Sequence, residues 1–223
     1  MSQQTITTPE LAERRLKMTY DEFLAWADED IHAEWVDGEV TVFVPPSIRH
    51  QRLVSLLHYL LGLYADLRNL GEVLVAPVEM RLEPRGSSRE PDLLFVAKAN
   101  ASRLSAARLD GPADLVVELV SDSSVARDRA DKFYEYQEAG IGEYWVIDPR
   151  PGKERVDLYA LTAEGRYQAI LPDADGRYHS VALPGFWMRA EWLWQDPLPK
   201  PLVLLQEIAA ETMRAALGSD AGS

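Results

Sequence analysis

Hydrophobic residues recur at two periods along this chain, and the two periods predict different elements. Between positions 47 and 70, leucines fall three and four residues apart, which predicts a long amphipathic helix that ends at Gly71. Positions 73–82 alternate between apolar residues and others, so we expect a strand there. Segments 91–96 and 115–120 are short apolar runs, and we expect each of them to form a buried strand.

Capping and turn residues mark the remaining elements. Thr19 and Glu22 have the spacing of a capping box, which opens a short helix. Asp37-Gly38 lies between β-rich flanks and predicts a tight hairpin turn. The other expected elements are a turn at 85–88, a polar connection at 100–112, a helix at 126–139, strands at 143–148, 155–161, 166–171 and 178–183, and a last helix at 201–217.

The order of these elements predicts an α+β or mixed α/β fold, in which a central mixed sheet is flanked by helices. The N-terminal hairpin and the C-terminal strands are additions to that core. A chain of 223 residues, of which 47% are hydrophobic, suits a single domain. We therefore expect a flexible arm at 1–17, one domain at 18–217 and a disordered tail at 218–223.

Charge and composition narrow the functional classes. The chain has 23 basic and 36 acidic residues, and a formal net charge of -13 argues against indiscriminate binding to polyanions. A nucleic-acid site would therefore need a local basic patch or a metal ion. The absence of cysteine excludes disulfides and thiolate metal sites. There is no apolar run of the ~18 residues that a membrane span needs, and no apolar leader, so we expect a soluble, cytoplasmic protein.

Two of the predicted buried strands carry one carboxylate each. Asp92 shares a strand face with Leu94, and Glu118 shares one with Val116, because side chains alternate along a strand. A buried carboxylate is costly unless it is paired, protonated or bound to a cation. If the two strands are neighbours, the carboxylates meet, and two hard oxygen ligands with open positions for water suit Mg²⁺. Such an ion activates water and stabilises charge on a phosphoryl group.

A metal site of this kind also needs a general base or a positive group nearby. Two residues after Glu118, on the same strand face, the chain has Val120 and not a lysine. Lys132 lies on the following predicted helix, with Asp128 four residues before it and Tyr136 four residues after it, all on one face. A helix packed on the sheet would aim the Lys132 ammonium at the two carboxylates.

These residues belong to a longer pattern, which resembles the Uma2 family, also called DUF820, of endonucleases in the PD-(D/E)XK nuclease superfamily. The ordered match covers about residues 18–190. It is carried by Glu34-Trp35-Val36-Asp37-Gly38-Glu39, His50, Pro91-Asp92, Val117 to Ser121, Asp128 to Tyr136 and Ala139 to Pro149. Asp122 departs from the pattern, since family members often have proline there.

The resemblance implies a restriction endonuclease-like fold and hydrolysis of DNA phosphodiester bonds that depends on Mg²⁺ or Mn²⁺. It implies that Asp92 and Glu118 are the metal ligands. Lys132 would be a displaced catalytic lysine, which orients the attacking water or stabilises the phosphorane. Because position 120 is valine, as is usual in this family, the hypothesis depends on Lys132.

Three further residues are candidate accessory members of the site. Glu39 and His50 match family positions near the hairpin and the long helix, and either could touch substrate or metal. Glu79 could complete the metal shell. The alternatives are an exposed strand face for Glu79 and helix capping or packing for His50.

Structural explanations stay open for the main candidates as well. Asp92 could be a turn-former, Glu118 could be a buried partner of an arginine, and Lys132 could be an exposed lysine paired with Asp128. An aromatic cluster could stack on bases, although we expect it to pack in the core; it consists of Phe133, Tyr134, Tyr136, Tyr144 and Trp145. Candidate phosphate contacts in a local basic patch are Arg81, Arg85, Arg89, Arg103, Arg108, Arg127 and Arg129.

The sequence leaves more than one function open. The first hypothesis is a metal-dependent DNA endonuclease that acts as a homodimer, since two antiparallel DNA strands suit a two-fold pair of sites. The second is a catalytically inactive nuclease-fold protein that serves as a binding or assembly module. A third is hydrolysis of RNA or of another phosphate ester by the same metal chemistry.

Overall fold

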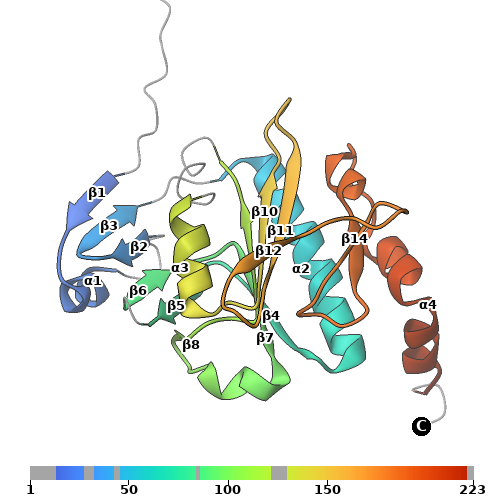
Figure 1. The fold of residues 1–223 in the computed structure, drawn as a ribbon, viewed down its shortest axis with the longest axis horizontal. Helices are drawn as coiled ribbons and strands as arrows, with labels where there is room; N and C mark the ends of the chain where they lie inside the picture. The colour runs from blue at the N-terminus through green and yellow to red at the C-terminus, as the bar shows by residue number, and fades with distance from the viewer. Residues whose placement is uncertain (1–13, 28–32, 43–45, 84–85, 122–129, 220–223) are drawn as a thin grey trace, which may run out of the picture.

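The computed structural model describes residues 14–27, 33–42, 46–83, 86–121 and 130–219. Within these residues the chain forms two six-stranded sheets, one central and one built largely from the N-terminal part (Figure 1). A separate two-stranded sheet lies near the C-terminal helix. The mixed α/β architecture agrees with the fold class that the sequence predicts.

The central sheet has the strand order β12-β11-β10-β9-β7-β4. Strands β9 and β10 are parallel, and the other neighbouring pairs are antiparallel, so the sheet is mixed, as predicted. Its strands are β4 (Gly71–Val75), β7 (Leu93–Ala97), β9 (Leu115–Leu119), β10 (Glu143–Asp148), β11 (Arg155–Leu161) and β12 (Tyr167–Ile170).

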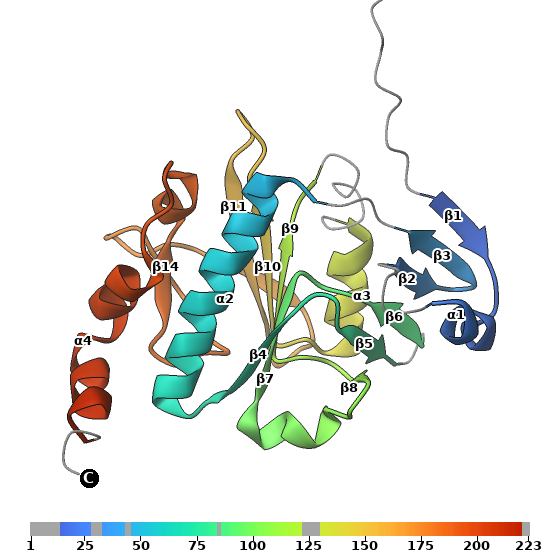
Figure 2. The ribbon, with the colours of Figure 1, turned by 180° about the vertical axis from the view of Figure 1, so that it is seen from behind.

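One helix covers each face of the central sheet. Helix α2 (Ile48–Arg68) lies on one face and α3 (Lys132–Ala139) on the other, which Figures 1 and 2 show from opposite sides. Ser47 caps α2 by accepting a hydrogen bond from the His50 amide at 3.2 Å. The predicted helix is confirmed, although its C-cap is Asn69, in the left-handed conformation, and not Gly71.

Alternation along the strands divides the core into two layers. Leu93 and Val117 pack with α2, whereas Leu94 and Val116 belong to the apolar cluster that includes Tyr136 of α3. Because Glu118 has the same parity as Val116, its side chain is on the α3 face. The sheet therefore presents Glu118 to α3, the helix that begins with Lys132.

Most of the predicted aromatic cluster packs in the core, as expected. Tyr136 and Tyr144 meet edge to face with ring centroids 5.1 Å apart, and Phe133 contacts Tyr159 in the same way. Trp145 is buried too, on the α2 face. Tyr134 is the exception, since 63% of its surface is exposed.

The second sheet has the order β1-β3-β2-β6-β5-β8. Its strands are β1 (Arg14–Lys17), β2 (Ala33–Val36), β3 (Glu39–Val42), β5 (Glu79–Leu82), β6 (Ser87–Arg89) and β8 (Arg108–Asp110). Helix α1 (Tyr20–Trp26) begins with the predicted capping box of Thr19 and Glu22. The predicted hairpin turn is also confirmed, because Asp37 and Gly38 both have positive φ.

Four local predictions are wrong because strands pair with segments that are distant in sequence. The single strand expected at 73–82 is two strands, β4 and β5, which join different sheets. Pro77 separates them, and a proline has no amide hydrogen to continue a ladder. Residues 14–17 of the expected flexible arm form β1, paired with β3. Ser87, expected in a turn, begins β6, and the expected polar connection at 100–112 contains β8.

The C-terminal part packs against α2. Strands β13 (Arg177–His179) and β14 (Trp187–Arg189) form the small sheet, and α4 (Pro201–Ser219) follows. The predicted strand at 178–183 is thus shorter, and the helix runs past the expected end at 217. Among the helices in the described part of the chain, none has the length and apolar character that a membrane crossing needs.

A matched pair of glycines tests the packing around the central sheet. A Cβ atom at Gly71 would lie 2.1 Å from the Val96 carbonyl oxygen, whereas one at Gly62, inside α2, meets nothing within 4 Å. We expect Gly71→Ala to lower the free energy of unfolding by about 1–3 kcal/mol through overpacking. Gly62→Ala should raise it by about 0.5–1 kcal/mol, because alanine has the higher helix propensity. Urea unfolding measures both free energies. If Gly71→Ala unfolds with the same free energy as the wild type, the close approach of β4 to β7 is contradicted.

Candidate active site

β7, which begins directly after Asp92, and β9, which carries Glu118, are neighbours, and this is the condition under which the two carboxylates meet. β7 and β9 are antiparallel with Leu93 opposite Val117, and continuing that register by one residue sets Asp92 opposite Glu118. Side chains directly opposite each other on an antiparallel pair share a face. The Leu119 amide donates a hydrogen bond to Asp92 Oδ2 at 2.7 Å, which fixes Asp92 to the end of β9.

Lys132 reaches the same place from α3. Its Nζ lies 2.9 Å from Glu118 Oε1 and 3.1 Å from Glu34 Oε1. Only 3% of the Lys132 surface is exposed, so the alternative of a solvent-exposed helix lysine is wrong. Asp128, the partner in that alternative, lies outside the described residues. The lysine expected from the helix pattern is therefore in contact with the acid expected from the strand pattern.

Tyr136 holds the same carboxylate oxygen. It lies one helical turn after Lys132, and its hydroxyl donates a hydrogen bond to Glu118 Oε1 at 2.9 Å. Burial, reinforced by the negative charge of Glu118, raises the pKa of Tyr136 well above its ordinary value. The hydroxyl therefore stays protonated at neutral pH and remains a donor, which orients the Glu118 carboxylate.

A buried arginine continues the network into the second sheet. Arg89 Nη1 lies 2.9 Å from Glu34 Oε2, and Arg89 Nε donates to Glu135 Oε2 at 3.0 Å. Although burial lowers the pKa of Arg89, the charges of Glu34 and Glu135 outweigh it and raise that pKa above its ordinary value. Only 5% of Arg89 is exposed, so the expectation that it contacts a phosphate is wrong.

Ion pairs connect the side chains of this buried cluster. In the described part of the chain they join three carboxylates, those of Glu34, Glu118 and Glu135, to two cations, those of Lys132 and Arg89. Asp92 is opposite Glu118 when the register of β7 and β9 is continued by one residue. Two carboxylates on one face of a sheet are candidate ligands for a cation.

A neighbouring acid, Glu90, titrates unusually. Burial, followed by the charges of Glu34 and Glu79, raises the pKa of Glu90 to about 8. The Glu90 backbone amide donates to Glu34 Oε1 at 3.2 Å, so the residue is part of the same surroundings.

The three candidate accessory residues, His50, Glu79 and Glu39, lie at different distances from Asp92 and Glu118. His50 Nε2 lies 3.3 Å from Asp92 Oδ2, so the structure places His50 at the site. Glu79, on β5, accepts a hydrogen bond from the Tyr20 hydroxyl at 2.7 Å and influences Glu90 by its charge. Glu39 lies on β3, opposite Lys17 of β1, in the other sheet from Asp92 and Glu118.

The donor set fits a hard divalent cation whose remaining ligands are waters. Mg²⁺ is commonly held through only one or two carboxylates and keeps several waters. Asp92 and Glu118 could supply those two carboxylates. A fuller protein shell is not available from the described residues, among which no group of three or more His, Asp or Glu side chains is arranged to hold a metal ion.

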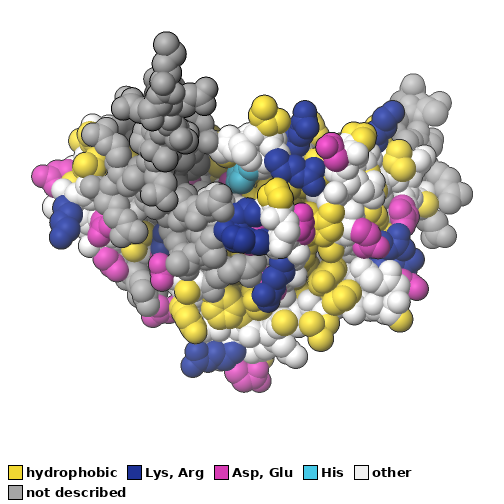
Figure 3. Space-filling model, turned by 90° about the horizontal axis from the view of Figure 1, so that it is seen from above, with side chains coloured by type: hydrophobic (Ala, Val, Ile, Leu, Met, Phe, Trp, Pro, Cys, Tyr) yellow, Lys and Arg dark blue, Asp and Glu magenta, His cyan; other side chains and the backbone are white. Residues whose placement is uncertain are grey.

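The arginines proposed for phosphate contact are mostly engaged elsewhere. Arg81 lies over the Tyr20 ring, 3.5 Å from its centroid. Arg103 donates to the Pro112 carbonyl oxygen. Arg108 forms an ion pair with Asp110. Arg85, Arg127 and Arg129 lie outside the described residues. Figure 3 shows several Lys and Arg side chains on the upper face of the molecule, among hydrophobic and other side chains, and a local basic patch stays a prediction.

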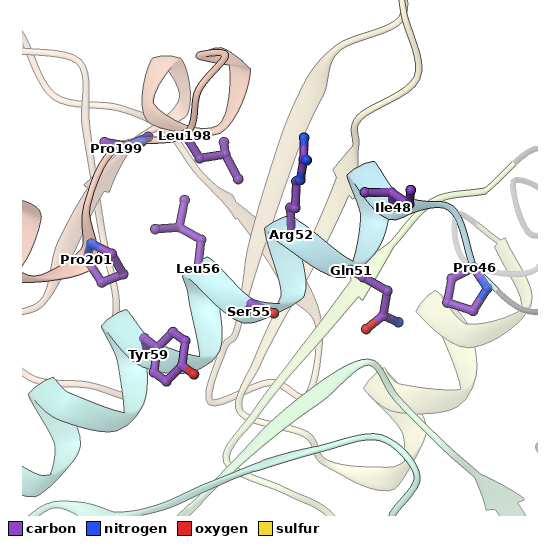
Figure 4. Close-up of a pocket in the computed structure, with 10 residues that line it drawn as sticks. All are labelled: Pro46, Ile48, Gln51, Arg52, Ser55, Leu56, Tyr59, Leu198, Pro199 and Pro201. Carbon is purple, nitrogen blue, oxygen red and sulfur yellow. The ribbon is translucent and has the colours of Figure 1, made fainter.

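A groove of about 460 Å³ lies elsewhere, along the outer face of α2 (Figure 4). Its lining combines Ile48, Arg52, Leu56 and Tyr59 of α2 with Pro46, Pro199 and Pro201, and none of the described residues that line it has a carboxylate. Neither metal binding nor phosphate chemistry is expected from this lining. The groove is therefore distinct from the site at Asp92 and Glu118.

Sequence reasoning did not select Glu34, Tyr136 or Glu135 as site residues. Glu34 was visible only as part of the segment that resembles Uma2, and Tyr136 only as a residue on the Lys132 face. The available signal for Glu34 was an acid in a short strand of apolar and aromatic residues. The same argument from burial that singled out Glu118 applies to it.

Comparisons with known proteins identify the family and the fold. A model of the Uma2 family, described as "Putative restriction endonuclease", matches residues 20–191. Among solved structures, a protein from Anabaena variabilis ATCC 29413, described as a putative nuclease belonging to DUF820, superposes with a TM-score of 0.63 at 15% identity. The match covers 78% of this chain and 96% of that one, and it shows a shared fold. No curated protein matches the chain.

Proposed function

This chain belongs to the Uma2 family, and on that premise we propose that it is a metal-dependent endonuclease that hydrolyses DNA phosphodiester bonds. The observation that supports the proposal most is the contact between Lys132 and Glu118 at the end of β9, beside Asp92. A buried lysine in contact with acids is a candidate catalytic group, because active sites are where buried charges are brought together.

In this proposal each residue has a separate task. Asp92 and Glu118 would hold Mg²⁺ or Mn²⁺, which when bound would activate water and stabilise charge on the phosphoryl oxygens. The Leu119 amide and the Tyr136 hydroxyl orient the two carboxylates. The Lys132 ammonium is adjacent to Glu118 and offers positive charge to the phosphate as negative charge develops on it. His50 supports Asp92 from the first turn of α2.

A plasmid assay tests the activity. Supercoiled plasmid is incubated with purified protein in Mg²⁺ or Mn²⁺, and a parallel sample contains EDTA. We expect nicked and then linear DNA only in the samples with metal, because the carboxylates without the ion have no means of activating water. Persistent cleavage in EDTA, or an inert protein in both metals at several salt concentrations, would contradict the proposal. A structured RNA in the same assay distinguishes ribonuclease activity.

One observation favours the second candidate, a binding or assembly module without catalysis. Glu118 Oε1 already accepts from both Lys132 and Tyr136, so protein groups satisfy the oxygen that a metal would share. Plasmid cleavage in Mg²⁺ or Mn²⁺ separates the two candidates. A nuclease cleaves the plasmid, and a module that keeps the fold, with or without the metal site, does not. The homodimer and the cytoplasmic location stay predictions from the sequence.

A further inference from the structure

Glu34 is a buried carboxylate near the candidate active site, and both of its oxygens have partners. Only 1% of it is exposed, and it lies on β2, in the other sheet from Asp92 and Glu118. Its Oε1 lies 3.1 Å from Lys132 Nζ and accepts from the Glu90 amide at 3.2 Å. Its Oε2 lies 2.9 Å from Arg89 Nη1. Both oxygens are therefore held, one by the lysine and one by the arginine.

A lysine in contact with a single acid has an imprecise position. The ammonium is a compact charge on a flexible four-carbon stem, so one contact lets it pivot around that acid. Glu34 supplies a second contact at nearly the same distance as the first, and it comes from a different sheet. Two anchors from separate elements define where Nζ lies relative to Glu118.

Arg89 makes this arrangement rigid. It lies on β6, beside β2, and its ion pairs with Glu34 and Glu135 connect the second sheet to α3. Because Arg89 neutralises Glu34 from the far side, Glu34 can approach Lys132 without adding another unbalanced charge. The chain of contacts runs from Glu135 through Arg89 and Glu34 to Lys132.

We infer that Glu34 is a positioning residue of the active site, which holds the Lys132 ammonium in place for phosphodiester hydrolysis. The inference rests on the proposed function and adds a role for the second sheet. That sheet, formed by β1, β3, β2, β6, β5 and β8, is then part of the catalytic unit through one side chain. Glu34 acts through Lys132 and does not itself touch the phosphate.

The test compares Glu34→Gln and Glu34→Asp with the wild type in steady-state plasmid cleavage. Because misplacing a catalytic group by about 1 Å can cost ~10²-fold in rate, we expect Glu34→Gln to lower kcat about 10- to 100-fold. KM should change less than about threefold, since the phosphate contacts are intact. Glu34→Asp keeps the charge and should recover part of the loss. Circular dichroism and thermal unfolding establish the folded fraction of each variant.

Glu143→Gln is the matched control. Glu143 is also a fully buried carboxylate, and it accepts hydrogen bonds from Ser180 and Trp145 at the other end of the central sheet. Its loss should lower stability and leave kcat per folded molecule unchanged. If Glu34→Gln cuts as fast as the wild type per folded molecule, or raises KM alone, the inference is wrong and the proposed function stands.

Two outcomes remain, and each is decisive. If Glu34→Gln does not fold, Glu34→Asp decides: a lower kcat with an unchanged KM supports positioning, and wild-type kinetics overturn it. If the wild-type protein itself does not cleave in any metal, the proposed function fails, and the positioning role in hydrolysis fails with it.

Discussion

Glu118→Gln is expected to reduce metal-dependent cleavage by about 10³-fold or more. The amide carries no negative charge, so the site loses one of its two anionic ligands for a hard cation. A loss of about 4 kcal/mol in transition-state stabilisation corresponds to three decades in rate. The amide would also turn a neutral group toward the Lys132 ammonium, where the wild type has an ion pair. Plasmid cleavage and Mn²⁺ titration calorimetry measure the two consequences, and both signals should be lost together.

Asp114→Asn serves as the control for this change. Asp114 immediately precedes β9, at the opposite end of the strand from Glu118, and accepts hydrogen bonds from Ala97 and Asn100. The substitution removes the same charge at the other end of β9, away from the site. We expect wild-type cleavage per folded molecule. Loss of cleavage in Glu118→Gln with full Mn²⁺ binding would show that Glu118 is not a metal ligand.

Lys132→Met is expected to affect both stability and activity. The substitution leaves Glu34 and Glu118 facing each other without the cation that now lies between them. Removing one partner from a buried ion pair costs about 3–5 kcal/mol, so urea unfolding should show a loss of that size. Cleavage per folded molecule should fall by about 10²- to 10³-fold, the usual effect of removing one charge stabiliser. Binding of Mn²⁺ should persist, because the carboxylates remain.

Lys98→Met is the control, because it removes the same charge at an exposed position away from the candidate site. Lys98 is exposed and follows β7 at the end away from Asp92, and its ammonium donates a hydrogen bond to Asn69 Oδ1 at 3.1 Å. The free energy of unfolding of Lys98→Met should stay within about 0.5 kcal/mol of the wild-type value, and its cleavage rate should be unchanged. If folded Lys132→Met cuts at the wild-type rate, the lysine has a structural role and the catalytic assignment is wrong.

Local pattern was sufficient to predict several parts of this fold. The period of two placed Glu118 on a defined face of its strand, and the helical spacing placed Lys132 and Tyr136 on one face of α3. The capping box at Thr19 and the Asp37-Gly38 turn were predicted from residues only a few positions apart. In each case, the physical cause acts within one turn or one strand, so the sequence contains it.

Other parts depend on residues that are distant in sequence. Strand β1 exists because β3 pairs with it, and segment 73–82 splits because its halves find partners in different sheets. Nothing within either segment specifies those partners. Register and sheet order follow from which apolar faces are buried together, and that is decided by the whole chain.

The candidate site divides in the same way. By itself, the sequence placed Glu118 in a buried strand and Asp92 at the start of another, and it singled out Lys132 as the candidate lysine, because burial of a charge requires compensation. Only the tertiary structure decided which charges compensate which. It brought Glu34 from β2 and Arg89 from β6 to Lys132, and it removed Arg89 from the candidate phosphate contacts. Coulomb interactions depend on distance in space, and the distance between two side chains is fixed only when their sheets and helix have packed.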